Sequence, residues 1–261
     1  MVTINNSTIK QFQYSDSIQR RYWDPKYVYE NFQQNGATSK VGGGAAGGTA
    51  GNNNVLILPT TAFEYSILGT QTITAPVITA AGLNIGSMDQ TDNDGLELNH
   101  GILSSQIPSF ITGTDDPFFL RCRFSIAVVA GTDDCAVGFR QVAANQANID
   151  DYNNMAVLNV ISGDIKIETI LANAATVTTD TTQNWANTET HELMILVDEM
   201  GNVTYTIDGQ PPTVTAAYQF PAGTNVMPFF YFLQTASIAG AVPIMIWECG
   251  HQTVTQNVNP N

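Results

Sequence analysis

Alternation of apolar and polar side chains over short stretches is the feature that most constrains the fold of this chain. In residues 119–128 the even positions are apolar, whereas the odd positions include Arg121, Arg123 and Ser125. A period of two is typical of a β-strand with one buried face. Similar runs recur about every ten residues, and no long stretch has the period of a helix. The sequence therefore predicts an all-β fold, either a sandwich or a jelly roll.

The individual strands and turns can be placed from the same pattern. Turns are expected at Ser162-Gly163-Asp164, at Asp208-Gly209 and at residues 131–134, the last as a hairpin that follows residues 119–128. Further strands are expected at residues 137–140, 155–161, 165–171, 193–197, 203–207, 229–233 and 244–247.

The composition changes around residues 36–54. Residues 1–40 hold five of the nine basic side chains and a group of aromatic residues, whereas residues 41–261 carry four basic and 20 acidic side chains, a net charge of −16. Residues 36–54, where the composition changes, are rich in glycine and asparagine and have little to bury. We therefore predict a docking arm over residues 1–40, a Gly-rich connector over residues 41–54 and a jelly-roll body over residues 55–261.

A short helix is expected within the arm. Asp24 is a favourable N-cap and Pro25 suits the first helical position, so the sequence predicts a helix over residues 25–34 that Asn35-Gly36 ends. Such a helix is too short to be stable alone. Its aromatic side chains must pack either on the body or on a partner, and both alternatives stay open.

Charge and cysteine content narrow the function classes. A formal net charge of −14 argues against nucleic-acid binding and against an anionic membrane surface, because both require clustered Lys and Arg. No apolar run approaches the length of a membrane span. Cys122, Cys135 and Cys249 are odd in number and irregularly spaced, so we expect buried, reduced thiols and no disulfide framework. The first residues lack the apolar segment of a signal peptide, and we expect synthesis in a reducing cytosol.

Residues 190–209 resemble part of a known fold. A hydrophobic strand ends in Val197-Asp198, and a Gly-containing turn leads to an aromatic strand that ends in Asp208-Gly209. This arrangement resembles the central hairpin of concanavalin A-like (laminin-G/glucanase-type) jelly rolls. The strands that close such a sandwich are similar to residues 228–232 and 243–248, and its earlier strands to residues 95–98 and 116–140. The resemblance covers about residues 90–250 and implies a concanavalin A-like jelly-roll β-sandwich.

The linked arm, the missing secretion signal and the Thr/Asn/Ala-rich body together resemble tailed-bacteriophage virion proteins. This resemblance implies a non-enzymatic structural protein on the capsid surface, a decoration or cement protein made in the host cytoplasm. It further implies contact with the major capsid protein or other virion proteins, and a homo-oligomer, most often a trimer. Because Arg, Tyr and Trp are typical hot-spot residues, the candidate assembly contacts are Arg20, Arg21, Tyr22, Trp23, Tyr27, Tyr29 and Phe32.

Two other functions remain open for the same fold. The first is a carbohydrate-binding tail-fibre or lectin-like receptor-binding module, and the second is a glycoside hydrolase. Glu97, Glu189, Glu192 and Glu199 do not reproduce the carboxylate spacing of a retaining glucanase. The sequence therefore predicts no enzymatic activity and no catalytic residues.

No metal or cofactor site is predicted. Residues 89–95 are rich in Asp but do not place acidic side chains at the ligand positions of an EF-hand, which leaves a solvated turn or another kind of calcium loop. His100, His191 and His251 are too scattered to form a metal set.

Overall fold

The computed structural model describes residues 24, 26–33, 40–42, 53–57, 62–69, 76–85, 93–100, 108–234 and 241–252. Within these ranges the chain forms strands β1–β17 and two short 3-10 turns, η1 (Val129–Gly131) and η2 (Ile149–Asp151). No helix in this part of the chain is long and apolar enough to cross a membrane. The strands form two sheets, which confirms the predicted all-β sandwich.

The smaller sheet has seven strands in the order β15-β14-β9-β17-β6-β5, and β1 pairs with β17 on the side that β6 also uses. All of these pairings are antiparallel. The strands are β1 (Val28–Asn31), β5 (Val77–Thr79), β6 (Gly82–Asn84), β9 (Phe118–Ser125), β14 (Thr190–Val197), β15 (Val203–Ile207) and β17 (Pro243–His251).

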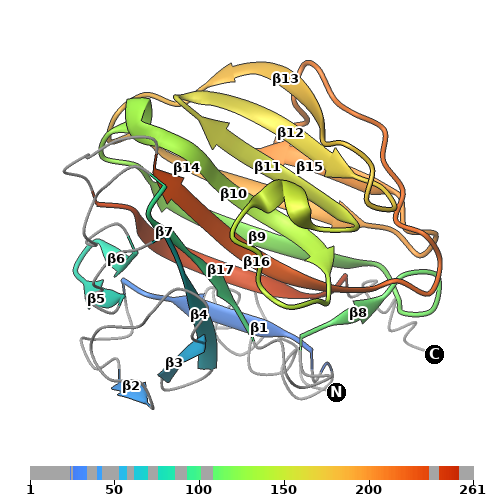
Figure 1. The fold of residues 1–261 in the computed structure, drawn as a ribbon, viewed down its shortest axis with the longest axis horizontal. Coiled ribbons are helices and arrows are strands. Elements are labelled where there is room, and N and C mark those ends of the chain that lie inside the picture. The colour runs from blue at the N-terminus through green and yellow to red at the C-terminus, as the bar shows by residue number, and fades with distance from the viewer. Residues whose placement is uncertain are drawn as a thin grey trace, which may run out of the picture.

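The larger sheet has ten strands in the order β13-β12-β11-β10-β16-β7-β4-β3-β2, and β8 pairs with the beginning of β16. Its strands are β2 (Lys40–Gly42), β3 (Asn53–Ile57), β4 (Ala62–Leu68), β7 (Gly95–Asn99), β8 (Phe110–Ile111), β10 (Thr132–Gln141), β11 (Met155–Ile161), β12 (Asp164–Ile170), β13 (Val177–Asn184) and β16 (Asn225–Gln234). The two sheets stack as the layers of a jelly roll (Figure 1).

The main hydrophobic core lies between the sheets. In β9 the even positions Leu120, Cys122 and Phe124 are fully buried, whereas Arg123 on the opposite face is exposed. Phe124 packs edge-on against Phe230 of the other sheet, with ring centroids 5.1 Å apart. The alternation that was visible in the sequence therefore marks the inner face of the seven-stranded sheet.

A second apolar cluster lies on the outer face of the ten-stranded sheet. It includes Tyr152, Phe229 and Tyr231, all of which are buried, together with Ile149 of η2. The segment between β10 and β11 crosses this face and covers it, and it appears in front of the sheet in Figure 1. The outer face is thus partly a second core, which decides how the polar side chains beside it are placed.

Most of the predicted strands and turns are confirmed. β11 and β15 have the predicted bounds, β10, β14, β16 and β17 contain the expected stretches, and β12 ends at Ile170, one residue before the predicted end. Ser162 and Gly163 form the tight turn between β11 and β12, with φ angles of 51° and 96°. Two successive positive φ values are the signature of a type I′ hairpin, for which a glycine is the favoured residue.

The hairpin predicted at residues 131–134 is wrong. β9 belongs to the seven-stranded sheet and β10 to the ten-stranded sheet, so the chain crosses from one layer to the other through η1. Ile126 and Val129 are buried along this crossing. Their burial between the layers stabilises the crossover, whereas a local pattern of turn residues carries no information about which sheet the next strand joins.

The helix predicted over residues 25–34 is also wrong, because residues 28–31 form strand β1. The Asp24 carboxylate accepts a hydrogen bond from the Lys26 amide at 2.9 Å and so closes a turn, and does not cap a helix. β1 then pairs with residues 246–249 of β17. A helix of this length gains little by itself, and an available strand edge outweighs its propensity.

Strands β1, β2 and β3 can be compared with the predicted division into arm, connector and body. Residues 28–31, within the predicted arm, are a strand of the seven-stranded sheet, and Lys40–Gly42 pairs with β3 at the edge of the ten-stranded sheet. β3 begins at Asn53, two residues before the predicted start of the body. The remainder of the predicted connector lies outside the described residues.

Cys122, Cys135 and Cys249 are free thiols, and all three are buried. Burial raises the pKa of each thiol. Because the thiolate is the reactive form, the three cysteines are poor nucleophiles in the folded protein and serve as small core residues.

Candidate functional site

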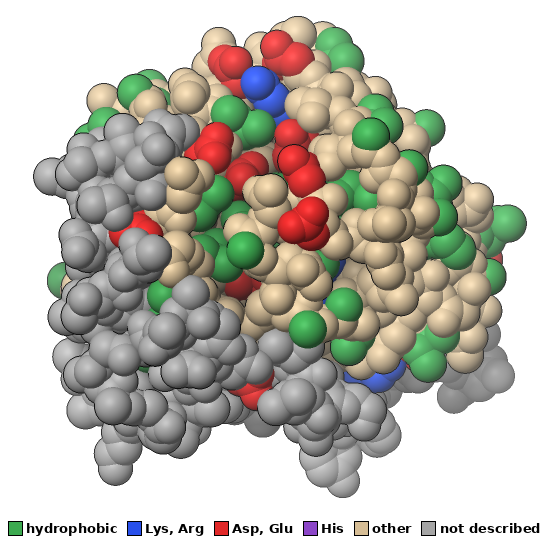
Figure 2. Space-filling view, viewed as in Figure 1, with side chains coloured by type: hydrophobic (Ala, Val, Ile, Leu, Met, Phe, Trp, Pro, Cys, Tyr) green, Lys and Arg blue, Asp and Glu red, His purple; other side chains and the backbone are tan. Residues whose placement is uncertain are grey.

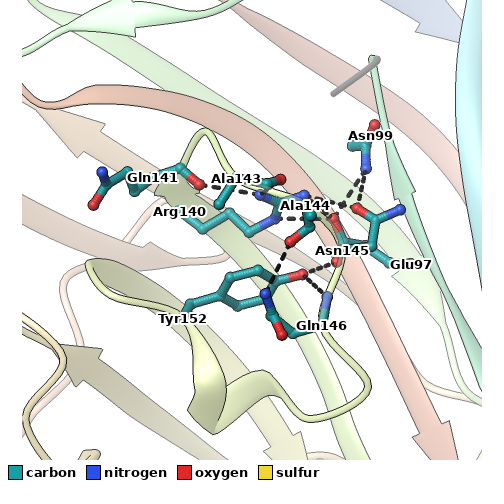
Figure 3. Close-up of polar contacts among 9 residues, drawn as sticks. All are labelled: Glu97, Asn99, Arg140, Gln141, Ala143, Ala144, Asn145, Gln146 and Tyr152. Carbon is teal, nitrogen blue, oxygen red and sulfur yellow. Dashed lines mark hydrogen bonds and ion pairs between the residues drawn. The ribbon is translucent and has the colours of Figure 1, made fainter. Parts of the chain in front are cut away.

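Polar side chains on the outer face of the ten-stranded sheet form the most connected cluster of the described residues. β7 presents Glu97 and Asn99 on this face, because Leu96 and Leu98 between them point into the core. Arg140 occupies the same face of β10 and alternates with the core residue Phe139. β16 separates the two strands, so the long Arg140 side chain reaches across it to Glu97 (Figure 3).

Glu97 and Arg140 form a completely buried ion pair. Arg140 donates from Nε and Nη2 to Glu97 Oε1 at 2.9 and 2.6 Å, and neither side chain is exposed to solvent. Arg140 also donates from Nη1 to the carbonyl oxygens of Gln141 and Ala143, at 3.0 and 3.1 Å. Its guanidinium lies 4.5 Å from the centroid of the Tyr152 ring. A buried charge pair is tolerated when further hydrogen bonds complete it, as they do here.

The segment that follows β10 closes over this pair. Tyr152 donates its hydroxyl proton to Glu97 Oε2 and accepts a hydrogen bond from the Gln146 amide at 3.1 Å. Asn145 Oδ1 accepts from Arg140 Nη2 at 2.9 Å and from Asn99 Nδ2 at 3.2 Å. Burial and the adjacent Glu97 carboxylate raise the pKa of Tyr152 far above its usual range, so its hydroxyl remains a donor. Both oxygens of Glu97 are thus engaged under a covering segment.

A second polar cluster lies further along the same face. Asn159 of β11 donates from Nδ2 to Asp134 Oδ1 at 2.6 Å and to Glu168 Oε2 at 2.7 Å. Thr178 of β13 donates to the other oxygen of Glu168 at 3.0 Å. Burial raises the pKa of Asp134 to about 7, and the Glu168 carboxylate adds to the rise although the Asn159 hydrogen bond opposes it. Figure 2 shows that Asp and Glu side chains gather on this side of the molecule.

The acidic and histidine residues considered in the sequence are dispersed in the structure. His191 Nδ1 lies 2.6 Å from Asp208 Oδ2, and its Nε2 lies 3.3 Å from Glu189 Oε2, at the edge of β14. The Asp198 carboxylate accepts from Asn202 and closes the β14–β15 turn. Among the described residues, no group of three or more His, Cys, Asp or Glu side chains could hold a metal ion. Residues 89–92 of the Asp-rich stretch lie outside the described part of the chain.

The predicted assembly contacts are divided by the structure. Arg20, Arg21, Tyr22 and Trp23 lie outside the described residues. Tyr27 is buried and donates its hydroxyl to Glu248 Oε1 at 2.5 Å, and Phe32 is buried beside Phe63. Tyr29 is half-buried opposite Glu248. Tyr27 and Phe32 therefore pack within the sandwich, and contact of this set with a partner stays a prediction.

The Glu97–Arg140–Tyr152 cluster is the feature that sequence reasoning missed. The sequence predicts Glu97 as a strand residue that lacks the carboxylate spacing of a glucanase, and Arg140 as the end of a strand, but it does not predict that the two side chains meet. One signal was present: Glu97 and Asn99 alternate with leucines, and Arg140 follows the apolar Phe139. That pattern shows that polar groups face away from the core, but it does not show that another segment covers them.

No family model and no curated protein matches this sequence. Among solved structures, the chain is similar to the carbohydrate recognition domain of Emp46p (TM-score 0.48, 8% identity, covering 72% of this chain and 87% of that chain). It is also similar to the exoplasmic/lumenal domain of VIP36 in its Ca2+/Man3GlcNAc-bound form (TM-score 0.48, 9% identity, 76% and 86%). A third similar structure is an alginate lyase from Pseudomonas aeruginosa (TM-score 0.45, 12% identity, 84% and 89%). At such identities the likeness concerns architecture alone.

Proposed function

We propose that this protein is a non-enzymatic structural component of a virion, a capsid decoration protein whose sandwich is a rigid module. The closure of the Glu97–Arg140–Tyr152 cluster supports the non-enzymatic part of this proposal, and the resemblance of the linked arm and the Thr/Asn/Ala-rich body to virion proteins supports the virion part. A catalytic carboxylate needs an oxygen that can reach substrate, whereas both oxygens of Glu97 are hydrogen-bonded and fully buried. The cluster holds the segment after β10 to the sheet, which is a structural task.

The surface charge supports the same proposal. The chain has a net charge of −14, and carboxylates gather on the outer face of the ten-stranded sheet (Figure 2). Such a surface repels nucleic acid and favours solubility. It suits a part that faces solvent on the outside of a particle, away from packaged DNA.

Copurification with particles tests this proposal. Virions from a lysate that contains the protein are separated from free protein on a density gradient, and each fraction is probed with an antibody against the chain. The proposal expects the protein in the particle fractions, at a constant ratio to the major capsid protein after repeated banding. Protein that stays in the soluble fractions, or a ratio that falls with each banding, contradicts it.

A second candidate function is glycan binding on the same outer face. The observation that favours it is the pair of exposed side chains Thr178 and Asp180 on β13, which offers hydroxyl and carboxylate groups to solvent above the buried Asp134–Asn159–Glu168 cluster. These groups are the donors and acceptors that can match the hydroxyl groups of a sugar. Because the face is acidic, an uncharged glycan fits it better than an anionic one.

A glycan array distinguishes the two candidates. Glycan binding predicts retention of neutral oligosaccharides that Thr178→Val and Asp180→Ala weaken, whereas Thr204→Val on the exposed edge of the other sheet leaves it unchanged. Absence of binding to every printed glycan removes this candidate and leaves the structural proposal standing.

A further inference from the structure

β1 and the residues beside it lie along the edge of β17, and we call this edge, together with the side chains that contact the segment, the β17 groove. Asp24, Tyr27, Val28, Glu30 and Phe32 are exposed by 7%, 6%, 8%, 0% and 1%. Five of the nine described side chains in this segment are therefore removed from solvent, although the strand itself has only four residues. The groove binds this segment through side chains on both of its faces.

Backbone pairing fixes the register of the segment. Val28 is opposite Cys249 and Asn31 is opposite Ile246 in an antiparallel ladder, which the Phe32 amide extends by donating to the Met245 carbonyl at 2.9 Å. Within the described part of the chain, β1 pairs with β17 alone. This arrangement has the geometry of strand addition, in which main-chain hydrogen bonds supply affinity and side-chain pockets supply specificity.

The end of β17 is shaped for the residues that it holds. A Cβ atom at Gly250 would lie 2.7 Å from Tyr27 Cδ2, so glycine at this position lets the Tyr27 ring approach the strand closely. The Tyr27 hydroxyl donates to Glu248, and the His251 amide donates to Asp24 Oδ2 at 2.8 Å. These contacts favour a segment that has a carboxylate and a tyrosine at the positions of Asp24 and Tyr27.

The link between β1 and the next strand is short. Only residues 34–39 separate Gln33 from β2, and β2 lies at the edge of the other sheet. Six residues reach at most about 20 Å. A short link can restrain an element in its own copy and so favour its exchange with an identical element of another copy. Exchange itself costs little, because the exchanged element makes the same native contacts.

We propose that the groove on β17 binds residues 24–33 of a second copy of this chain, so that neighbouring copies exchange strand β1. The contacts of the groove favour this segment, and every copy carries the segment. The exchanged copies keep the Tyr27–Glu248 and Asp24–His251 contacts, now between two chains. This inference does not depend on whether the protein acts on a virion or on a glycan.

A disulfide across the ladder tests the exchange. Val28 and Cys249 are directly opposite each other, and the Cα atoms of such pairs are about 4.5–5.5 Å apart, which a disulfide can span. Full-length Val28→Cys is oxidised in a glutathione buffer at high protein concentration and run on a non-reducing gel. The proposal expects covalent dimers or larger species that a reductant converts to monomer. A chain that stays monomeric, whether internally cross-linked or with free thiols, overturns it.

Two controls separate exchange from collision. Leu193 lies opposite Cys122 between two central strands, so Leu193→Cys can cross-link only within one chain and is expected to remain monomeric. Doubling the length of residues 34–39 with Gly and Ser in the Val28→Cys chain is expected to convert most covalent oligomer into internally cross-linked monomer. If Leu193→Cys forms as much oligomer, or if the longer link has no effect, the cross-links are collisional and the proposal falls.

Discussion

Arg140 donates two hydrogen bonds to a single oxygen of Glu97, while Tyr152 occupies the other oxygen. This relationship joins three parts of the chain that are far apart in sequence: β7, the end of β10 and the segment before β11. Because the pair is fully buried, its partners have no water to replace them. The covering segment and the second apolar cluster beneath it therefore depend on one another.

Arg140→Met is expected to lower the free energy of unfolding by about 3–5 kcal/mol, because it leaves the Glu97 carboxylate buried without its cation. Urea denaturation monitored by tryptophan fluorescence measures the change. Lys166→Met is the matched control, since Lys166 lies on the same sheet in a half-exposed pair 3.8 Å from Asp164. Its loss should stay within about 0.5 kcal/mol. Equal losses in the two variants would show that the buried pair has no special role.

Removing the hydroxyl of Tyr152 or of Tyr205 should have opposite effects. Tyr152→Phe loses a hydrogen bond to a buried carboxylate and is expected to cost about 1.5–3 kcal/mol. Tyr205 is equally buried, but its hydroxyl has no hydrogen-bond partner among the described residues, so Tyr205→Phe is expected to be neutral or stabilising. Urea midpoints of the two variants check this. A larger loss for Tyr205→Phe than for Tyr152→Phe would contradict the hydrogen-bond assignment.

The raised pKa of Asp134 predicts a pH-dependent stability. Since the folded protein releases this proton near pH 7 and an unfolded Asp releases it near pH 4, the free energy of unfolding falls as the pH rises through this range. Asp134→Asn should remove this contribution, which is at most roughly 4 kcal/mol. The difference between wild type and variant, measured by urea titration from pH 4 to pH 8, isolates it. A difference that is independent of pH would contradict the shift.

Asp198→Asn provides a control of opposite sign. Although slight burial opposes the effect, hydrogen bonds from Asn202 and from backbone amides lower the pKa of Asp198. Its stabilising contribution is present above the pKa of an unfolded Asp and is lost as the pH falls through the lower, folded pKa. The stability of wild type minus that of the variant should therefore fall with rising pH between about pH 4 and pH 7 for Asp134→Asn, and rise with pH below about pH 4 for Asp198→Asn, so the second titration is extended to lower pH.

The strands of the second half of the chain could be predicted because each pattern is local. The predicted strands over residues 155–161 and 193–197 match β11 and β14. They could be predicted because the buried positions of these strands carry apolar side chains. The same argument missed β13, whose eight residues are mostly exposed and rich in threonine. An edge strand of this kind has no apolar face to reveal it.

The remaining errors arise from contacts between distant residues. β1 is a strand because residues 246–249 offer it an edge, and the crossing from β9 to β10 is set by the stacking of two sheets. In the same way, Glu97 and Arg140 are 43 residues apart, and the sequence around either residue does not predict that they form a pair. Burial of a polar pair depends on a segment that folds over it, and the local pattern of apolar and polar residues does not show which segment that is.

The most direct test of the proposed function is immunogold electron microscopy of purified particles with an antibody against this chain. Capsid decoration predicts gold distributed over the heads, at many positions on each particle, and little gold on the tails. Label confined to the tail tips would contradict the capsid proposal and favour the glycan-binding alternative. Particles without label, in a lysate where the antibody detects the protein, would contradict a virion role altogether.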